Sequence, residues 1–128
     1  MEIRIKDANG QTNLSIEIVD KESNGEWVIC VAHFSYDGFE AKFKFSTMLG
    51  NFHTFTDELE VLYSTLKGQA KFHSMEDNVS FQLSTDDMGH IEISGYLRHK
   101  LYEVKTSFLI HSDQTFLPEL LQECRQIK

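Results

Sequence analysis

The first half of the chain alternates apolar and polar residues with the period of two that is typical of β-strands. Ile3 and Ile5 alternate with charged neighbours, and a second run has apolar residues at 14, 16 and 18. The segment 26–34 is apolar at nearly every position, which predicts a central strand covered on both faces. Alternation returns from Phe39 to Phe45, so we expect the side chains at 39, 41, 43 and 45 to face inward. The turn signals Asn9-Gly10 and 35–38 lie between these runs, so we expect hairpins there.

The period changes after Gly50 to the spacing of a helix, with apolar residues at 55, 59, 62, 63 and 66. We expect Thr54 to cap this helix, because a threonine hydroxyl accepts a hydrogen bond from a backbone N–H of the first turn. Asp57 and Glu58 then fall in that turn, where negative charge suits the helix dipole. Gly68 is expected to close the helix.

The second half predicts the same order of elements, with strands over 70–72, 79–83, 91–97 and 102–110. Gly95 inside the third of these strands indicates a bulge or a close approach of two backbones. The last helix has apolar residues at 117, 120, 121, 124 and 127. Pro118 favours Thr115 over Asp113 as its cap, because a proline beyond the first turn removes an internal hydrogen bond.

These elements predict an α+β fold with mostly antiparallel sheets of about eight strands and two helices, in the order ββββα-ββββα. The strands follow one another too closely for parallel crossover units. The two helix starts read Thr-Phe-Thr-Asp-Glu-Leu at 54–59 and Thr-Phe-Leu-Pro-Glu-Leu at 115–120. This match indicates a possible duplication with pseudo-repeats 1–68 and 69–128, although capping and amphipathic patterning favour the same text. The length fits a single domain over 1–128.

The composition is that of a globular chain with an ample core. Apolar residues make up 41% of the sequence and include ten phenylalanines. No apolar run is long enough to cross a bilayer, and the first residues alternate as a strand does rather than forming a signal peptide. Cys30 and Cys124 are far apart in the sequence and lie in apolar surroundings, so we expect buried, reduced thiols. A cytoplasmic location follows as an expectation.

No motif in the sequence carries catalytic, cofactor or metal chemistry. The six histidines do not form any of the HxH, HxxxH or HExxH patterns that place two ligands together. There is no G-x-S-x-G nucleophile elbow and no glycine-rich phosphate loop. We therefore expect no catalytic residues, no cofactor and no metal site. Two alternatives stay open, namely a small-molecule-binding or enzymatic α+β domain and an oligomeric structural module.

The formal charge of −8 arises from 20 acidic residues against 12 lysines and arginines. Such a surface repels phosphate backbones, which argues against direct nucleic-acid binding, and it attracts a basic protein partner. Solubility alone is the simpler explanation of the charge. Exposed carboxylates in turns and on helices, together with one aromatic residue beside them, are the candidate partner-binding residues: Tyr36, Asp37, Asp57, Glu60, Glu76, Asp77, Asp86 and Asp87.

Several segments together resemble the WapI-type immunity proteins of bacteria. They are Phe-x-x-Glu-Leu-x-x-Leu at 55–62, Val-Ser-Phe at 79–81, Gly-His-Ile-x-Ile-Ser-Gly-Tyr-Leu at 89–97 and Asp-Gln-Thr-Phe-Leu-x-x-Leu at 113–120. The resemblance implies a non-enzymatic protein that neutralises the C-terminal domain of a polymorphic toxin in the cytoplasm. Many such toxins are nucleases, which tend to be basic, so the resemblance agrees with the acidic charge of this chain.

Overall fold

The computed structural model describes residues 1–86, 88–98 and 104–128. The expected order ββββα-ββββα is confirmed. The first half comprises β1 (Glu2–Lys6), β2 (Thr12–Lys21), β3 (Trp27–Tyr36), β4 (Phe39–Met48) and α1 (Leu49–Thr65). The second half comprises β5 (Gln69–His73), β6 (Val79–Thr85), β7 (His90–Arg98), β8 (Lys105–Asp113), a 3₁₀ turn (Gln114–Phe116) and α2 (Leu117–Arg125). The expected start of the last strand at Tyr102 lies outside the described residues.

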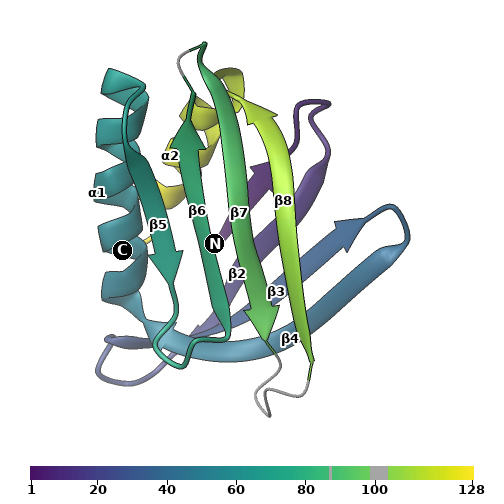
Figure 1. Ribbon diagram of the computed structural model, residues 1–128. Helices are drawn as coiled ribbons and strands as arrows, with labels where there is room; N and C mark the ends of the chain where they lie inside the picture. Colours follow the sequence, from purple (N-terminus) through teal and green to yellow (C-terminus); the bar gives the residue numbers. More distant parts are fainter. Residues whose placement is uncertain (87, 99–103) are drawn as a thin grey trace.

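The eight strands form two separate four-stranded antiparallel sheets, each a simple meander. The first sheet has the order β1-β2-β3-β4 and the second has the order β5-β6-β7-β8. In Figure 1 the strands of the second sheet cross in front of the first sheet, whose β3–β4 hairpin extends past β8 on the right. Each sheet therefore has two outer strands, namely β1 and β4 in the first sheet and β5 and β8 in the second.

Each helix packs against the sheet of the other half. Helix α1, which follows the first sheet, lies along β5 of the second sheet, and α2 lies along β1 of the first sheet. The two helices also contact each other. The first strand of each half is thus covered by the helix that ends the other half.

The inner faces of both sheets and both helices share one hydrophobic cluster. Its centre is aromatic: Phe72 lies 4.9 Å from Phe52 and 5.3 Å from Phe81 between ring centroids, and Phe55 lies 5.3 Å from Phe81. All four rings are at most 1% exposed. Offset and edge-to-face pairs of this kind add to the stabilisation that comes from burying the rings. This cluster holds α1 on the second sheet.

The expected start of the first helix was wrong. Helix α1 begins at Leu49, directly after β4, with Met48 as its N-cap. The side-chain oxygen of Asn51 accepts the Met48 N–H at 3.1 Å, and Leu49 N–H donates to the Glu26 carbonyl at 2.7 Å. Thr54 therefore lies inside the helix, and Asp57 and Glu58 lie beyond its first turn. The start was expected near Thr54 because methionine is not among the residues that usually cap a helix.

The C-terminus of α1 and the N-terminus of α2 also differ from expectation. Helix α1 ends at Thr65 with Leu66 in the left-handed region at φ 53°, two residues before Gly68. Before α2, the Asp113 carboxylate accepts the Thr115 N–H at 3.0 Å and caps the 3₁₀ turn. The expectation that Thr115 is the cap was therefore wrong. Pro118 does lie in the first turn of α2, where its missing N–H breaks no hydrogen bond.

Strand β3 is interior to its sheet but is covered on one face only. The residues Val28, Cys30, Ala32 and Phe34 are buried, whereas Trp27, Ile29, Val31 and His33 on the other face are half-buried. The expectation of two covered faces was wrong, because both helices lie on the inner side. Side chains of the neighbouring strands flank the outer face instead: the register pairs Val31 with Glu17 and with Lys44.

The close approach predicted at Gly95 is confirmed. A Cβ atom there would lie 2.2 Å from the Ser80 carbonyl oxygen and 2.7 Å from Phe81 Cα. Gly95 pairs with Phe81 in a regular register, so the contact is a close packing of strands and not a bulge.

Candidate functional site

The inner face of the first sheet is not covered along its whole length. Along β4, burial on this face falls from Thr47 and Phe45, which are buried, through Phe43 and Ala41 to Phe39, which is 73% exposed. Along β3 the same face ends at Tyr36, which is 56% exposed. The tip of the β3–β4 hairpin extends beyond the second sheet (Figure 1). The exposed aromatic side chains of Tyr36 and Phe39 lie at this tip. We call this region, Tyr36, Phe39, Ala41 and Phe43, the overhang.

Strand β8 borders the overhang. The rings of Phe34 on β3 and Phe108 on β8 stack with centroids 5.1 Å apart and an interplanar angle of 24°, which joins the two sheets. Beyond this pair the sheets separate and leave an apolar groove of about 310 Å³. Tyr36 and Phe39 line it from the hairpin, and residues 106–110 line it from β8. Leu109 on β8 is 56% exposed.

A polar cleft of about 560 Å³ continues from this groove. We call it the tip cleft, because the tips of the β1–β2 and β3–β4 hairpins line it together with β8. Its lining residues are Asp7, Asn9, Gln11, Thr12, Asn13, Ser35, Tyr36, Asp37, Leu109, Ile110 and His111. Two carboxylates and no lysine or arginine are among these residues, so the cleft has a negative charge.

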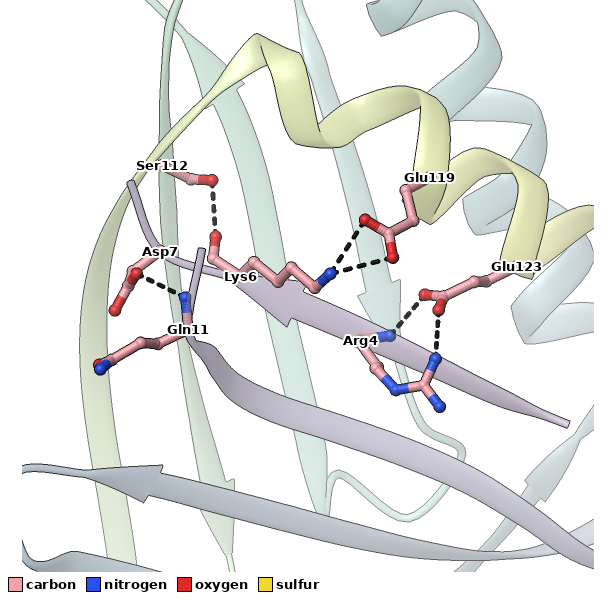
Figure 2. A network of polar contacts seen from close by, with 7 residues as sticks. All are labelled: Arg4, Lys6, Asp7, Gln11, Ser112, Glu119 and Glu123. Atoms are coloured by element: carbon pink, nitrogen blue, oxygen red, sulfur yellow. Dashed lines mark hydrogen bonds and ion pairs between the residues drawn. The ribbon is translucent and has the colours of Figure 1, made fainter. Parts of the chain in front are cut away.

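The β1–β2 turn is fixed against β8. The N–H of Ala8 donates to the His111 carbonyl at 2.9 Å, and the Ser112 hydroxyl donates to the Lys6 carbonyl at 2.6 Å (Figure 2). Within the turn, the Asp7 carboxylate accepts the N–H groups of Asn9 and Gln11 at 2.9 and 3.0 Å. One wall of the tip cleft is therefore held in place by β8 and by the turn itself.

The basic side chains of β1 are bound by helix α2. Lys6 Nζ lies 2.9 Å from both carboxylate oxygens of Glu119 on α2. Arg4 binds Glu123 of the same helix, with Nη1 to Oε2 at 2.6 Å. Figure 2 shows Lys6 directed toward Glu119, whereas Asp7 follows the end of the strand and is directed toward Gln11. The charges of Asp7 and Asp37 are therefore not neutralised by β1.

Asn13 places a buried polar group in the lining of the cleft. The residue is 4% exposed, and its Nδ2 donates to the Ser35 carbonyl at 3.1 Å. A carbonyl oxygen only accepts, so this bond fixes the orientation of the amide. The Oδ1 atom is buried and has no hydrogen-bond partner among the described residues.

Two of the predicted partner-binding residues meet in this region. Tyr36 and Asp37 are adjacent in sequence, and Asp37 with Gly38 forms the two-residue turn of the β3–β4 hairpin. Both turn residues have positive φ, at 46° and 89°. Asp-Gly is a preferred pair for such turns, which orient the flanking residues for strand pairing. Here those flanking residues are Tyr36 and Phe39.

The other candidates are dispersed over the molecule. Asp57 is exposed on α1, and Glu60 on the same helix forms an ion pair with Arg125 at 3.1 Å. Glu76 is exposed in the β5–β6 turn. Asp86 follows β6 and lines a second cleft, which shares His111 with the tip cleft. Asp87 lies outside the described residues.

Asp77 and Asp86 are occupied by local contacts. Asp77 accepts a hydrogen bond from the Tyr96 hydroxyl and lies 3.1 Å from Arg98 and 3.4 Å from His73. The Tyr96 hydrogen bond is the main reason that the pKa of Asp77 is lowered. Asp86 accepts the N–H groups of Met88 and His90 at 2.8 and 2.9 Å, which lowers its pKa as well. Asp77 thus links the β5–β6 turn to β7, and Asp86 stabilises the turn that it begins.

Sequence reasoning missed several residues of the site, namely Asp7, Asn13, Phe39, Leu109 and His111. Asp7 precedes Asn9-Gly10, where an aspartate that binds turn amides is common, so its place at a hairpin tip had a signal. Phe39 was expected to face inward, and it does lie on the inner face. The exposure of Phe39 depends on where the second sheet ends, and no local sequence pattern indicates that position.

The two cysteines of the chain lie in the core. Burial raises the pKa of both Cys30 and Cys124 to about 12. Both thiols are buried and free, as expected. Within residues 1–86, 88–98 and 104–128, no three histidine, cysteine, aspartate or glutamate side chains come together as metal ligands. No helix in these ranges is long and apolar enough to cross a membrane.

The paired meanders, each followed by a helix on the opposite sheet, define an α+β architecture that also occurs in solved structures. The chain is similar to the crystal structures of MRP1/MRP2 from Trypanosoma bruciei, with a TM-score of 0.52 and 10% identity over 99% of this chain and 81% of that chain. The plant transcriptional regulator PBF-2 gives a TM-score of 0.49 and 14% identity over 99% of this chain and 78% of that chain. At this level of identity the first likeness shows the fold alone.

Comparison of the sequence with models of protein families is more specific than the likeness of folds. Residues 4–127 match the Immunity protein WapI-like family, and the chain belongs to that family. The resemblance noted in the sequence is thereby confirmed over nearly the whole chain. A search of curated proteins found no match.

Proposed function

We propose that this protein binds the C-terminal domain of a polymorphic toxin and neutralises it in the cytoplasm without catalysing a reaction. The observation that carries the proposal is membership of the immunity family over residues 4–127. The toxin domain is expected to be basic, as a nuclease would be, because the chain carries a charge of −8. The same charge disfavours direct contact with nucleic acid.

We place the contact surface at the overhang and the tip cleft. Aromatic residues dominate the energetics of many interfaces, and Tyr36 and Phe39 are exposed close to Asp7 and Asp37. Neither carboxylate forms an ion pair with a lysine or arginine among the described residues. A basic surface docked here gains apolar contact at the aromatic rings and charge complementarity at the cleft. The first predicted candidates, Tyr36 and Asp37, are part of this surface, and the dispersed acids contribute to long-range attraction.

A small-molecule-binding or enzymatic function is the second candidate, because the tip cleft brings Tyr36, His111 and two aspartates together. Its volume of about 560 Å³ falls in the usual range for ligand sites. Such sites are mostly apolar, however, and this lining is mostly polar. A charged side chain of a protein partner fits the lining better than a small metabolite does.

The test is binding to the toxin domain encoded beside this gene, measured by calorimetry at about 50 mM and about 300 mM salt. We expect association that weakens as salt rises, and protection of growth when the toxin domain is produced in cells. Asp37→Asn keeps the turn, because asparagine also accepts positive φ, and is expected to weaken binding by about tenfold. Asp57→Asn removes the same charge from α1 and is the matched control. No binding at low salt would falsify the proposal.

A further inference from the structure

We infer that the toxin domain adds an extended strand to the outer edge of β8, between that edge and the overhang. The inference deepens the proposed function and rests on it for the identity of the partner. The chemistry of the occupant is an extended basic segment with apolar side chains on one face. The contact would extend the second sheet from four strands to five.

The backbone of β8 has hydrogen-bonding groups available on its outer side. Ala8 N–H binds the His111 carbonyl, so the backbone groups of His111 face away from β7. The register between β7 and β8 shows no shift, and in an antiparallel ladder these directions alternate. The N–H and C=O groups of Lys105, Ser107 and Leu109 therefore also face outward. None of the described residues forms a hydrogen bond with them.

The overhang shows where a fifth strand would lie. Phe34 is 5% exposed because Phe108 of β8 stacks on it. Tyr36 and Phe39, which continue the same face beyond β8, have no strand above them and are 56% and 73% exposed. A strand paired to β8 would extend the second sheet over these rings. One binding event would thus satisfy a row of backbone groups and bury an apolar surface, which is how β-strand addition gains affinity.

The charge of the site selects a basic occupant over a second copy of this chain. The tip cleft at the end of the groove contains Asp7 and Asp37 and no lysine or arginine. Two copies paired edge to edge would each bring a charge of −8. Like charges oppose such pairing, whereas a segment with lysine or arginine complements the cleft.

Amide hydrogen exchange of the complex is the direct test. In the isolated protein, the amides of Ser107 and Leu109 are expected to exchange rapidly. In the complex with the toxin domain encoded beside this gene, their exchange should slow at least about tenfold, which docking on a sheet face would not produce. A stable complex in which these two amides stay unprotected would overturn strand addition and leave the proposed function intact.

A proline variant tests the same point through affinity. Ser107→Pro removes an N–H that does not bind β7, so pairing within the protein is retained. We expect it to weaken toxin binding at least about tenfold. Lys44→Pro is the matched control, because Lys44 occupies the equivalent outward position on the free edge of β4. Phe39→Ser, with Met88→Ser as its exposed apolar control, gives the second measurement should either proline variant fold poorly. Wild-type affinity of both Ser107→Pro and Phe39→Ser contradicts the inference.

A peptide probe separates the inference from the proposed function. An alternating valine–lysine octapeptide should shift and protect the amides of Ser107 and Leu109, and a valine–glutamate octapeptide should not. Binding of the first peptide without binding of the toxin domain supports the edge site and counts against the proposed function. The same amides are also followed in the protein alone at rising concentration. If their protection increases with concentration and light scattering detects a dimer, a second copy is the occupant and the inferred partner is overturned.

Discussion

The side chain of Glu58 on α1 accepts the backbone N–H of Lys71 through Oε1 at 2.8 Å. Glu123 on α2 accepts the backbone N–H of Arg4 in the same way at 2.9 Å (Figure 2). Arg4 and Lys71 are the third residues of β1 and β5, which are the outer strands that the helices cover. Unpaired N–H groups make an outer strand a template for pairing with other chains. Each helix thus closes one such edge with one carboxylate.

Removal of Glu58 should open the β5 edge. We expect Glu58→Ala to increase the exchange rate of the Lys71 amide, whereas Glu58→Gln retains an acceptor oxygen and protects it in part. The loss of one hydrogen bond to a charged group should lower the free energy of unfolding by about 1 to 2 kcal/mol. Exchange rates followed by NMR give the measurement. Equal Lys71 rates in Glu58→Ala and the wild type would show that the bond is not maintained in solution.

Gly95 should tolerate no side chain. A Cβ would overlap backbone atoms of β6, which cannot move without disturbing the sheet. Gly95→Ala is therefore expected to lower the free energy of unfolding by at least about 2 kcal/mol. Gly50→Ala is the matched control, because nothing lies within 4 Å of its Cβ position in α1. That change should be neutral or stabilise by up to about 1 kcal/mol. Denaturant unfolding curves measure both, and the idea fails if the two variants are equally stable.

The two thiols should be unreactive in the folded protein. Burial raises the pKa of Cys30 and Cys124 to about 12, so almost no reactive thiolate exists at neutral pH. A thiol reagent such as Ellman's should modify neither in native buffer and both in denaturant. Rapid modification of one thiol under native conditions would show that its surroundings open far more easily than the core does.

Asp77 should titrate below the ordinary range of aspartate. Its pKa is lowered by the Tyr96 hydroxyl first and by Arg98 and His73 next. Because the folded-state pKa lies below the unfolded value of about 3.9, the carboxylate stabilises the fold fully above that pH. This contribution is lost as the pH falls through the lower, folded-state pKa. NMR titration should give a higher Asp77 pKa in Tyr96→Phe than in the wild type, and an unchanged value would remove Tyr96 as the main cause.

The strands could be predicted because each one has a local pattern of apolar and polar residues in the sequence. The alternation at Ile3 and Ile5 and the turn pairs Asn9-Gly10 and Asp37-Gly38 are local signals that no distant contact overrides. The start of α1 was missed because its cap uses Met48 and Asn51 in place of a threonine or serine. The residues of β3 also gave no indication that its outer face would stay half-exposed, because they are apolar on both faces.

The candidate site could be predicted only in part. Tyr36 and Asp37 were recognisable because exposed turn residues beside acids are common contact points. The overhang and the tip cleft depend on how far one sheet extends beyond the other. That distance is set by the Phe34–Phe108 stack and the anchoring of Ala8 on His111, which join residues 74 and 103 positions apart. Neither contact leaves a pattern within a window of the sequence.

The reciprocal placement of the helices makes the two halves interdependent. A fragment ending at 68 would keep its four strands but lack the helix that shields β1, and its own helix would have no sheet to lie on. Two identical half-length chains could cover both sheets by exchanging their helices in a symmetric dimer. The intact chain thus has the architecture of two half-length units that have exchanged their helices.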